Sequence, residues 1–433
     1  MDTGDLVELE ITGVAHGGVF VARHEGRVVF VPDAIPGERV RARLTDTKKS
    51  SFWRAEALEV LDASPDRRPH VWDAADISLA PERRAGGADF GHIALERQRA
   101  LKLDVFSDAL RRIGRFGDEP TVTMQQPTAL PSADGGTSAE TPDGTGWRTR
   151  VSLHVDDEGR VGPFAARSHR VIAVDDLPLA TPAVERAFAR LRGGSAGRIE
   201  LVQPADGRVR ILNRPDERST PVSDETLIER VGDREFRVDA GGFWQVHRLA
   251  AHTLTQLVAE ELRASGAGVD PDAAHLDLYG GVGLFAATLG ELAGHGVRVT
   301  SIESDPRATE HAGENLAEWV GARAETARVD RYITRLAADA SDRERERLSR
   351  GTILLDPPRA GAGRQVVEGI AALRPALVAY VACDPVALAR DLRTFADLGY
   401  SVRRSIRAVD LFPNSHHVEA VAVLERDTDN MAP

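Results

Sequence analysis

The single cysteine of this 433-residue chain, Cys383, follows an apolar run and precedes Asp384-Pro385. The apolar run predicts a buried strand, and a proline favours the first turn of a helix. A thiol between the end of a strand and the start of a helix is placed for nucleophilic attack, because the helix dipole favours the thiolate. A lone cysteine can equally be a small buried hydrophobe. The residues that accompany it therefore decide between the two interpretations.

Three carboxylates are placed much like Cys383, at the ends of apolar runs. Asp356 follows the apolar run 352–355, Glu303 follows the predicted strand 297–302, and Glu419 opens the last predicted strand. Pro357-Pro358 stiffens the chain directly after Asp356 and fixes the position of that carboxylate. Because ligands bind at the carboxyl ends of the strands in open α/β sheets, we expect these carboxylates and the thiol to share one rim. Such a group could supply a nucleophile and a general base.

A glycine-rich turn, Tyr279-Gly280-Gly281-Val282-Gly283, lies between a predicted strand and a predicted helix. Glycines there let the backbone approach a nucleoside cofactor, and Glu303 is placed to bind ribose hydroxyls. The turn alone would equally fit NAD. The adjacent His416 and His417 lack a third metal ligand, so we expect no metal site and interpret both as structural or RNA-facing.

These residues lie in a region of alternating strands and helices, which predicts a doubly wound, Rossmann-like α/β domain over residues 238–433. The expected strands are 276–279, 297–302, 352–355, 376–382 and 418–424, with helices from 284 and over 306–319.

The first part of the chain predicts a small, OB-like β-barrel over residues 1–62, because apolar and polar residues alternate there. Arg39, Arg41 and Arg43 share one expected face, followed by Lys48-Lys49 and Phe52-Trp53. Basic side chains with aromatics suit single-stranded or looped RNA, although a solvated strand face gives the same pattern. Residues 63–237 form an expected middle α+β domain with a helix at 95–113, strands at 148–155, 160–166, 197–202 and 209–212, and a flexible loop at about 125–146.

Composition sets the remaining limits. A net charge of −12 does not favour nucleic acid, but a phosphate backbone responds to local basic patches. No apolar run is long enough to cross a bilayer, and the acidic amino-terminal segment does not resemble a secretory signal. One cysteine makes neither an intramolecular disulfide nor a four-cysteine metal site. The length suggests two or three domains, and we expect a cytoplasmic protein that acts as a monomer.

Taken together, the motifs resemble the RNA uridine-5-methyltransferase family over nearly the whole chain, including a TRAM-type barrel. The motifs that carry the resemblance are Phe243-Trp244-Gln245-Val246, the turn Tyr279 to Gly283, Glu303, Glu314-Asn315, Asp330, Asp356-Pro357-Pro358-Arg359, Tyr380 to Pro385, and His417-Val418-Glu419.

The resemblance implies an RNA substrate, with ribosomal RNA slightly favoured over transfer RNA, and S-adenosylmethionine as the methyl donor. It implies that Cys383 adds to C6 of a uridine and that Glu419 removes the C5 proton after methyl transfer. It further implies that the cofactor and the target base are bound by Gln245, Tyr279, Glu303, Asp330 and Asp356.

Three positions depart from the family pattern. Many TRAM-bearing members hold an iron–sulfur cluster on four cysteines, whereas the matching stretch here, 84–90, contains none, so no such cluster is expected. Leu284 and His247 replace asparagines that are usual in the family. Alternatives left open are an N-methyltransferase that uses Asp356-Pro357-Pro358, a catalytically silent RNA-binding factor, and an NAD-dependent enzyme.

Overall fold

The amino-terminal residues form a closed five-stranded barrel with the strand order β1-β2-β3-β5-β4. Its strands are β1 (Leu6–Ala15), β2 (Val19–His24), β3 (Arg27–Val31), β4 (Arg39–Asp46) and β5 (Phe52–Asp62). Alternate side chains such as Val7, Leu9 and Ile11 fill the barrel, while the residues between them face solvent. The computed structural model describes residues 1–131, 137–166, 168–192, 195–214, 225–266, 268–402 and 404–427. The predicted barrel is confirmed.

The middle of the chain contributes a four-stranded antiparallel sheet in the order β10-β9-β11-β12. The elements of this region are two short 3-10 helices, η1 (Asp73–Ala75) and η2 (Pro81–Arg83), then α1 (Leu95–Arg112), β6 (Val122–Gln125), β7 (Leu130–Pro131), β8 (Thr137–Ser138), β9 (Arg150–Val155), β10 (Val161–Gly162), α2 (Pro182–Phe188), β11 (Gly197–Val202) and β12 (Arg210–Arg214). The four-stranded sheet packs on α2 and on the segment that carries Trp72 and Ala75.

The middle segment 63–237, expected as one domain, is divided in the structure. Phe106, Ala109 and Leu110 of α1 belong to the core of the large α/β sheet, and β6 pairs with the edge strand of that sheet. The hairpin β13 (Thr226–Val231) and β14 (Arg234–Asp239) packs on the opposite face of the same sheet. The apolar side chains of α1 and of the β13–β14 hairpin are therefore buried against the large sheet and not against the four-stranded middle sheet.

The expected flexible loop at about 125–146 includes residues 132–136, which lie outside the described residues. The described parts on either side make specific contacts. β7 pairs with β8, Glu140 pairs with Arg99 of α1, and the backbone carbonyls of Asp143 and Gly144 accept hydrogen bonds from Asn414. This segment therefore packs against the loop that leads to the last strand.

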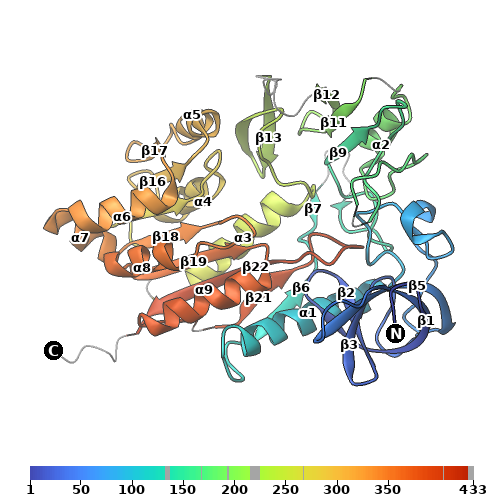
Figure 1. Cartoon of the computed structure of the whole chain (residues 1–433). Helices are drawn as coiled ribbons and strands as arrows, with labels where there is room; N and C mark the ends of the chain where they lie inside the picture. Colours follow the sequence, from blue (N-terminus) through green and yellow to red (C-terminus); the bar gives the residue numbers. More distant parts are fainter. Residues whose placement is uncertain are drawn as a thin grey trace.

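The remaining chain forms a sheet with the order β17-β16-β15-β18-β19-β22-β21-β6, and β20 also pairs with β22 (Figure 1). Strands β15 to β19 run parallel, and β22 runs antiparallel to β19. Its strands are β15 (Ala274–Leu278), β16 (Arg298–Glu303), β17 (Arg323–Thr326), β18 (Thr352–Leu355), β19 (Leu377–Ala382), β20 (Tyr400–Val402), β21 (Ile406–Val409) and β22 (Glu419–Arg426). Its helices are α3 (Ala250–Ala264), α4 (Leu284–Ala293), α5 (Pro306–Asn315), α6 (Val329–Asp339), α7 (Asp342–Ser349), α8 (Arg364–Leu373) and α9 (Pro385–Asp397).

Helices cover both faces of this sheet, as a doubly wound fold requires. Successive side chains of β19 alternate between two cores: Val378 and Tyr380 face the helices α6 to α9, whereas Ala379 and Val381 face α3 and α4. Because β18 and β19 are buried on both faces, they read as continuous apolar runs in the sequence. No helix among the described residues is long and apolar enough to cross a membrane.

Candidate active site

A cavity of about 990 Å³, here called the catalytic cavity, lies at the carboxyl ends of the central strands. It is lined by residues from β15, β16, β18, β19 and β22, together with the segment that follows β14. Six of the seven predicted site residues line it: Gln245, Tyr279, Glu303, Asp356, Cys383 and Glu419. The predicted convergence of the thiol and the carboxylates at one rim is thus present in the structure.

The glycine-rich turn forms one wall of this cavity. Tyr279 and Gly281 line it with left-handed backbone angles of φ 63° and 53°, a conformation that is uncommon outside glycine. A Cβ atom on Gly280 would lie 2.0 Å from Oγ of Ser301, so no larger residue fits beneath the turn. The strained Tyr279 brings its ring to the cavity, and the glycines leave the backbone accessible to a ligand.

Glu303 ends β16 beside the turn, and backbone amides fix its carboxylate. Its Oε2 accepts a hydrogen bond from the Gly281 amide (3.1 Å), and its Oε1 accepts one from the Asp305 amide (2.9 Å). A fixed carboxylate that lines the cavity next to a glycine turn is suited to accept hydrogen bonds from the two hydroxyls of a ribose.

The opposite side of the turn holds a cluster that was not identified from the sequence. Asp239, at the end of β14, pairs with Arg307 (2.9 Å) and with His311 (2.6 Å) of α5, and all three line the cavity. These contacts join the hairpin β13–β14 to α5 across almost seventy intervening residues. Only the spatial arrangement reveals them, because none of the three residues belongs to a recognisable motif.

Cys383 follows β19 and is half-buried. Burial, and then the nearby negative charges of Glu419 and Asp356, raise the pKa of its thiol to about 12. The predicted preference for the thiolate is therefore wrong for the free protein. The amino end of α9 is instead capped by Asp384, whose Oδ1 accepts from the Ala387 amide (2.8 Å).

Two carboxyls share the cavity with this thiol. Burial raises the pKa of Asp356 to about 7. Burial and the charge of Asp356 raise the pKa of Glu419 well above its usual range, while the cation of Arg359 opposes that effect. Each negative charge thus disfavours the next one, so the three acids do not all ionise together near neutral pH.

Arg359 follows the two prolines, and a chain of polar groups orients it. Its guanidinium donates to Nε2 of His417 (3.1 Å), whose pKa burial lowers to about 3, so this ring is a neutral acceptor. The His417 ring lies 4.0 Å from that of His416, and Nδ1 of His416 lies 2.6 Å from Oδ2 of Asp89. The two histidines hold the cavity wall in place. In the described residues no cluster of histidine, cysteine and carboxylate side chains could hold a metal ion.

The barrel also reaches this site. His16, in the turn after β1, lies 2.7 Å from Oδ2 of Asp384, the residue next to Cys383. A second cavity of about 210 Å³, here called the side cavity, lies between this turn, α1 and the thiol. Cys383 is therefore accessible from two directions, and one of them is bounded by the barrel.

Asp330 is the predicted site residue that the structure does not bring to the cavity. It lies in the first turn of α6, where its carboxylate pairs with Arg328 (2.9 Å). Burial is the main reason that the pKa of Tyr279 rises to about 12, and the negative charge of Asp330 is a smaller contribution to the same rise. His247, a departure from the family pattern, is buried and stacks on Trp147 (5.4 Å between ring centroids), so it has a structural role.

The residues present fit a nucleoside cofactor. The turn leaves open space at Gly281, Glu303 provides fixed acceptors beside it, and Tyr279 and the exposed Phe243 present aromatic rings at the same cavity. The volume exceeds what one such molecule needs, which leaves room for a base next to Cys383. An α/β fold of this topology with a glycine turn, a ribose-type carboxylate and an adjacent thiol defines a nucleoside-dependent group-transfer enzyme.

Comparisons with known proteins make the class specific. Residues 2–58 match the TRAM domain, and residues 270–427 match the tRNA (uracil-5-)-methyltransferase family. A protein of Streptomyces avermitilis named as an RNA methyltransferase is 39% identical, over 98% of each chain. The 23S rRNA (uracil(1939)-C(5))-methyltransferase RlmD of Shewanella sediminis is 27% identical, over 97% of this chain and 96% of its own.

A solved structure has the same fold over almost its whole length. It is the tRNA (uracil-54, C5)-methyltransferase of Pyrococcus abyssi with S-adenosyl-L-homocysteine, at 22% identity and a TM-score of 0.67, covering 96% of this chain and 99% of that one. The chain belongs to the RNA uridine-5-methyltransferase family, as a TRAM-bearing member, and uses S-adenosylmethionine.

Proposed function

We propose that this enzyme methylates C5 of a uridine in ribosomal RNA through a covalent bond between Cys383 and C6 of the base. The observation that carries the proposal is the placement of Cys383, Glu419 and Asp356 on the cavity that also contains the glycine turn. Support for ribosomal RNA comes from the relative named for 23S rRNA, which aligns with 97% of the chain.

The cysteine is required because C5 of uracil is a poor nucleophile. When Cys383 adds to C6, the S–C6 bond forms and the electrons of the C5=C6 bond move onto C5 and O4. The thiol must lose its proton in this step. Asp356, with a pKa of about 7, is ionised in a large fraction of molecules at neutral pH and is a suitable acceptor. S-Adenosylmethionine, when bound, supplies the electrophilic methyl group that C5 takes.

Glu419 then completes the reaction by removing the proton that C5 still carries. The electrons of the C5–H bond restore the C5=C6 double bond as the S–C6 bond breaks, and the cysteine is released. A carboxylate with a raised pKa is a strong base once it has ionised. Uptake of the thiol proton by Asp356 removes the negative charge that raises the pKa of Glu419, so Glu419 can release its own proton to solvent and then accept the one from C5. Asp356 returns its proton to the sulfur of Cys383 as the S–C6 bond breaks.

The barrel is proposed to bind RNA through one part of the expected basic group, the lysines with the aromatic pair, and not through the row of arginines. Arg39, Arg41 and Arg43 each pair with carboxylates of neighbouring strands, among them Glu59 and Glu56. These ion pairs neutralise the row of arginines, so it is a poor phosphate site.

A second basic group lies at the other end of the strands. Lys49 and Arg54 lie over the Phe52 ring (4.6 and 5.7 Å), and Arg27 lies over that of Trp53 (4.7 Å). Within the described parts of the chain these three cations and Lys48 have no carboxylate partner. Unpaired cations beside the partly exposed Phe52 ring suit a single strand, because they offer charge together with a stacking surface; Trp53 belongs to the barrel core and supports Arg27 from beneath.

Mapping 5-methyluridine in total RNA from cells with and without the gene tests the proposal. One or more ribosomal 5-methyluridines should disappear in the deletion and return when the gene is restored. Loss of 5-methyluridine from transfer RNA alone would show that transfer RNA, and not ribosomal RNA, is the substrate. Loss of a methylated amino group in place of 5-methyluridine would favour the N-methyltransferase alternative.

A further inference from the structure

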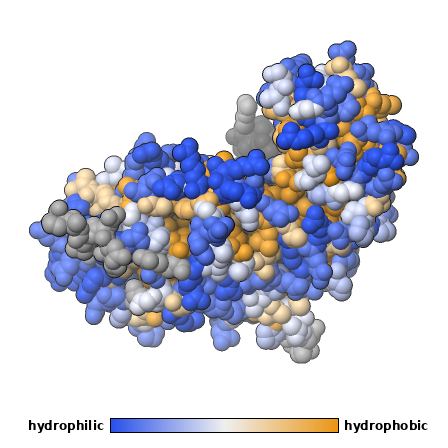
Figure 2. Space-filling model, turned by 90° about the horizontal axis from the view of Figure 1, so that it is seen from below, coloured by the Kyte–Doolittle hydropathy of each residue, from blue (hydrophilic) through white to orange (hydrophobic). Residues whose placement is uncertain are grey.

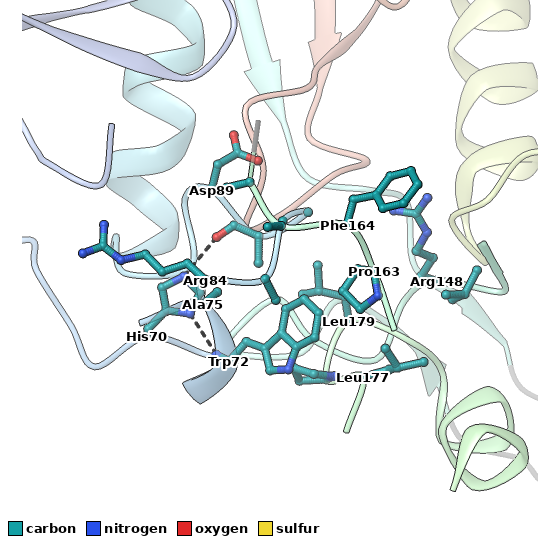
Figure 3. Close-up of a pocket in the computed structure, with 18 of the residues that line it drawn as sticks. His70, Trp72, Ala75, Arg84, Asp89, Arg148, Pro163, Phe164, Leu177 and Leu179 are labelled. Atoms are coloured by element: carbon teal, nitrogen blue, oxygen red, sulfur yellow. Dashed lines mark hydrogen bonds between the residues drawn. The ribbon is translucent and has the colours of Figure 1, made fainter. Parts of the chain in front are cut away.

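A third cavity of about 450 Å³, here called the middle cavity, lies between the segment 70–89 and the four-stranded middle sheet (Figure 3). Its walls are largely apolar and include Trp72, Leu153, Phe164, Leu177 and Leu179. In Figure 3, Arg148 lies on one side of the cavity and His70 and Arg84 on the other. The size lies within the range of small-molecule sites.

The aromatic walls are held in fixed orientations. The Phe164 ring stacks on that of His154, with 3.6 Å between centroids and 13° between planes. The indole nitrogen of Trp72 donates to Oδ1 of Asp176 (2.8 Å), which satisfies its polar atom and leaves the ring as an apolar wall. Flat, rigid, apolar walls of this kind suit the faces of a nucleobase.

The middle cavity adjoins the site of methyl transfer. Arg148 lines both the middle cavity and the catalytic cavity, and Gly17 and His416 line both the middle cavity and the side cavity next to Cys383. A strand that places a uridine at Cys383 therefore has the middle cavity within reach of its neighbouring nucleotides.

Arg148 is suited to the phosphate between two such nucleotides. Its Nε donates to the carbonyl of Arg150 (2.9 Å), and it has no carboxylate partner among the residues that the structure describes. Burial, and then the cation of Arg359, lower the pKa of Arg148 because both destabilise its positive charge. A negatively charged ligand would therefore stabilise the charged guanidinium. In the space-filling view of Figure 2, hydrophobic residues are exposed among hydrophilic ones on the right-hand part of the molecule.

The polar side of the cavity provides a hydrogen-bond acceptor. Oδ2 of Asp89 accepts a hydrogen bond from the backbone amide of His416 (3.2 Å) and lies 2.6 Å from Nδ1 of the same residue. No other residue in the described part of the chain donates a hydrogen bond to Oδ1 of Asp89. Burial opposes ionisation of this carboxyl, but the hydrogen bond and charge of His416, together with smaller contributions from the backbone amide of Asp89 and from His417, outweigh it and lower the pKa. A free carboxylate oxygen can accept a hydrogen bond from the amino group of a base. A base without a donor at that position cannot make this hydrogen bond.

We infer that the middle cavity receives a second, unpaired nucleobase of the same RNA strand, one that carries an exocyclic amino group and lies within two nucleotides of the methylated uridine. This inference rests on the proposed function, because it places a uridine at Cys383. It makes the cavity a specificity site: Phe164 and Trp72 enclose the base, Asp89 accepts from its amino group, and Arg148 binds the intervening phosphate.

A cavity-filling variant tests the inference by kinetics. Ala75 is buried and lines the cavity, so Ala75→Phe should exclude the base; Ala80→Phe adds the same bulk at an exposed position of the same segment. With RNA from cells that lack the gene and tritiated S-adenosylmethionine, Ala75→Phe should raise KM for RNA at least tenfold. Its kcat should stay within threefold, and both its melting temperature and its Kd for S-adenosylhomocysteine should match those of Ala80→Phe.

A cross-link provides a second readout if Ala75→Phe does not fold. The photoreactive residue p-benzoylphenylalanine in place of Phe164 should cross-link to a base with an amino group, within two nucleotides of the methylated position. A wild-type KM in folded Ala75→Phe, or a cross-link that maps elsewhere, would overturn the inference. The wild-type enzyme separates the two hypotheses: if it methylates a different atom or no RNA, the proposed function fails whatever the cavity binds.

Discussion

The thiol of Cys383 should be almost unreactive in the free enzyme, in contrast to the activated cysteine that its position before a helix suggests. With a pKa of about 12, roughly one molecule in ten thousand carries the thiolate at pH 8, compared with about one in ten for an ordinary thiol of pKa 9.0. Because alkylating agents react with the thiolate, we expect alkylation at pH 8 to be about a thousandfold slower than for an unfolded control.

Iodoacetamide labelling followed by intact mass spectrometry measures this rate without ambiguity, because the chain contains one cysteine. The rate should rise about tenfold per pH unit from 7 to 10 with no plateau, since the raised pKa lies above this window. Glu419→Gln removes one of the charges that raise the pKa and should speed alkylation at the pH values at which Glu419 is ionised; Arg359→Ala removes the opposing cation and should slow it.

The pH profile, more than the absolute rate, carries the argument, because restricted access would slow alkylation equally at all pH values. A plateau below pH 9 would show a stabilised thiolate and would refute the reasoning. In that case the amino end of α9 would act on the thiol in spite of the cap that Asp384 provides.

Three further predictions follow from the geometry. Gly280→Ala should abolish S-adenosylhomocysteine binding in calorimetry, because the added Cβ would lie 2.0 Å from Oγ of Ser301; unchanged affinity would mean that the turn does not shape the cofactor site. Replacing Lys48 and Lys49 by Gln should weaken binding to unrelated RNAs alike and reduce its salt dependence, whereas the ion-paired Arg41→Gln should do so much less; equal effects would contradict the assignment of the basic face. The purified protein should contain no stoichiometric iron by elemental analysis. Iron in proportion to protein would contradict the interpretation that residues 84–90, which lack cysteine, hold no iron–sulfur cluster.

The sequence predicted the α/β domain well because its central strands are buried on both faces and therefore appear as uninterrupted apolar runs. The run 352–355 coincides with β18, and 376–382 includes β19. Asp356 and Cys383 could be placed because each follows such a run directly, and Glu303 because it ends the predicted strand before the next helix. The short strands β6 and β21 were missed, since four residues give too little pattern and their pairing joins distant segments.

Other parts of the site depend on contacts that no local pattern encodes. Asp239 reaches α5, Arg148 comes from the start of the middle sheet, and His16 comes from a turn of the barrel. The expectation for the thiol failed because it considered the helix dipole and neither the burial of the thiol nor the two carboxylates that share the cavity. Asp330 was assigned by resemblance alone, and its ion pair with Arg328 holds it away from the cavity wall.

The central claim is a covalent reaction in which Cys383 and Glu419 act at different steps. Replacing Glu419 by Gln keeps the shape of the side chain but removes the base, so the thiol can add and the methyl group can transfer while the C5 proton stays.

The decisive measurement is a denaturing gel of enzyme incubated with substrate RNA and methyl-labelled S-adenosylmethionine. Glu419→Gln should accumulate a slowly migrating, methyl-labelled protein–RNA band, and wild-type enzyme should form the same band with 5-fluorouridine RNA, whose C5 fluorine cannot leave as a proton. Cys383→Ala should give neither a band nor methylated RNA. Methylation by Cys383→Ala, or normal turnover by Glu419→Gln without an adduct, would contradict the account.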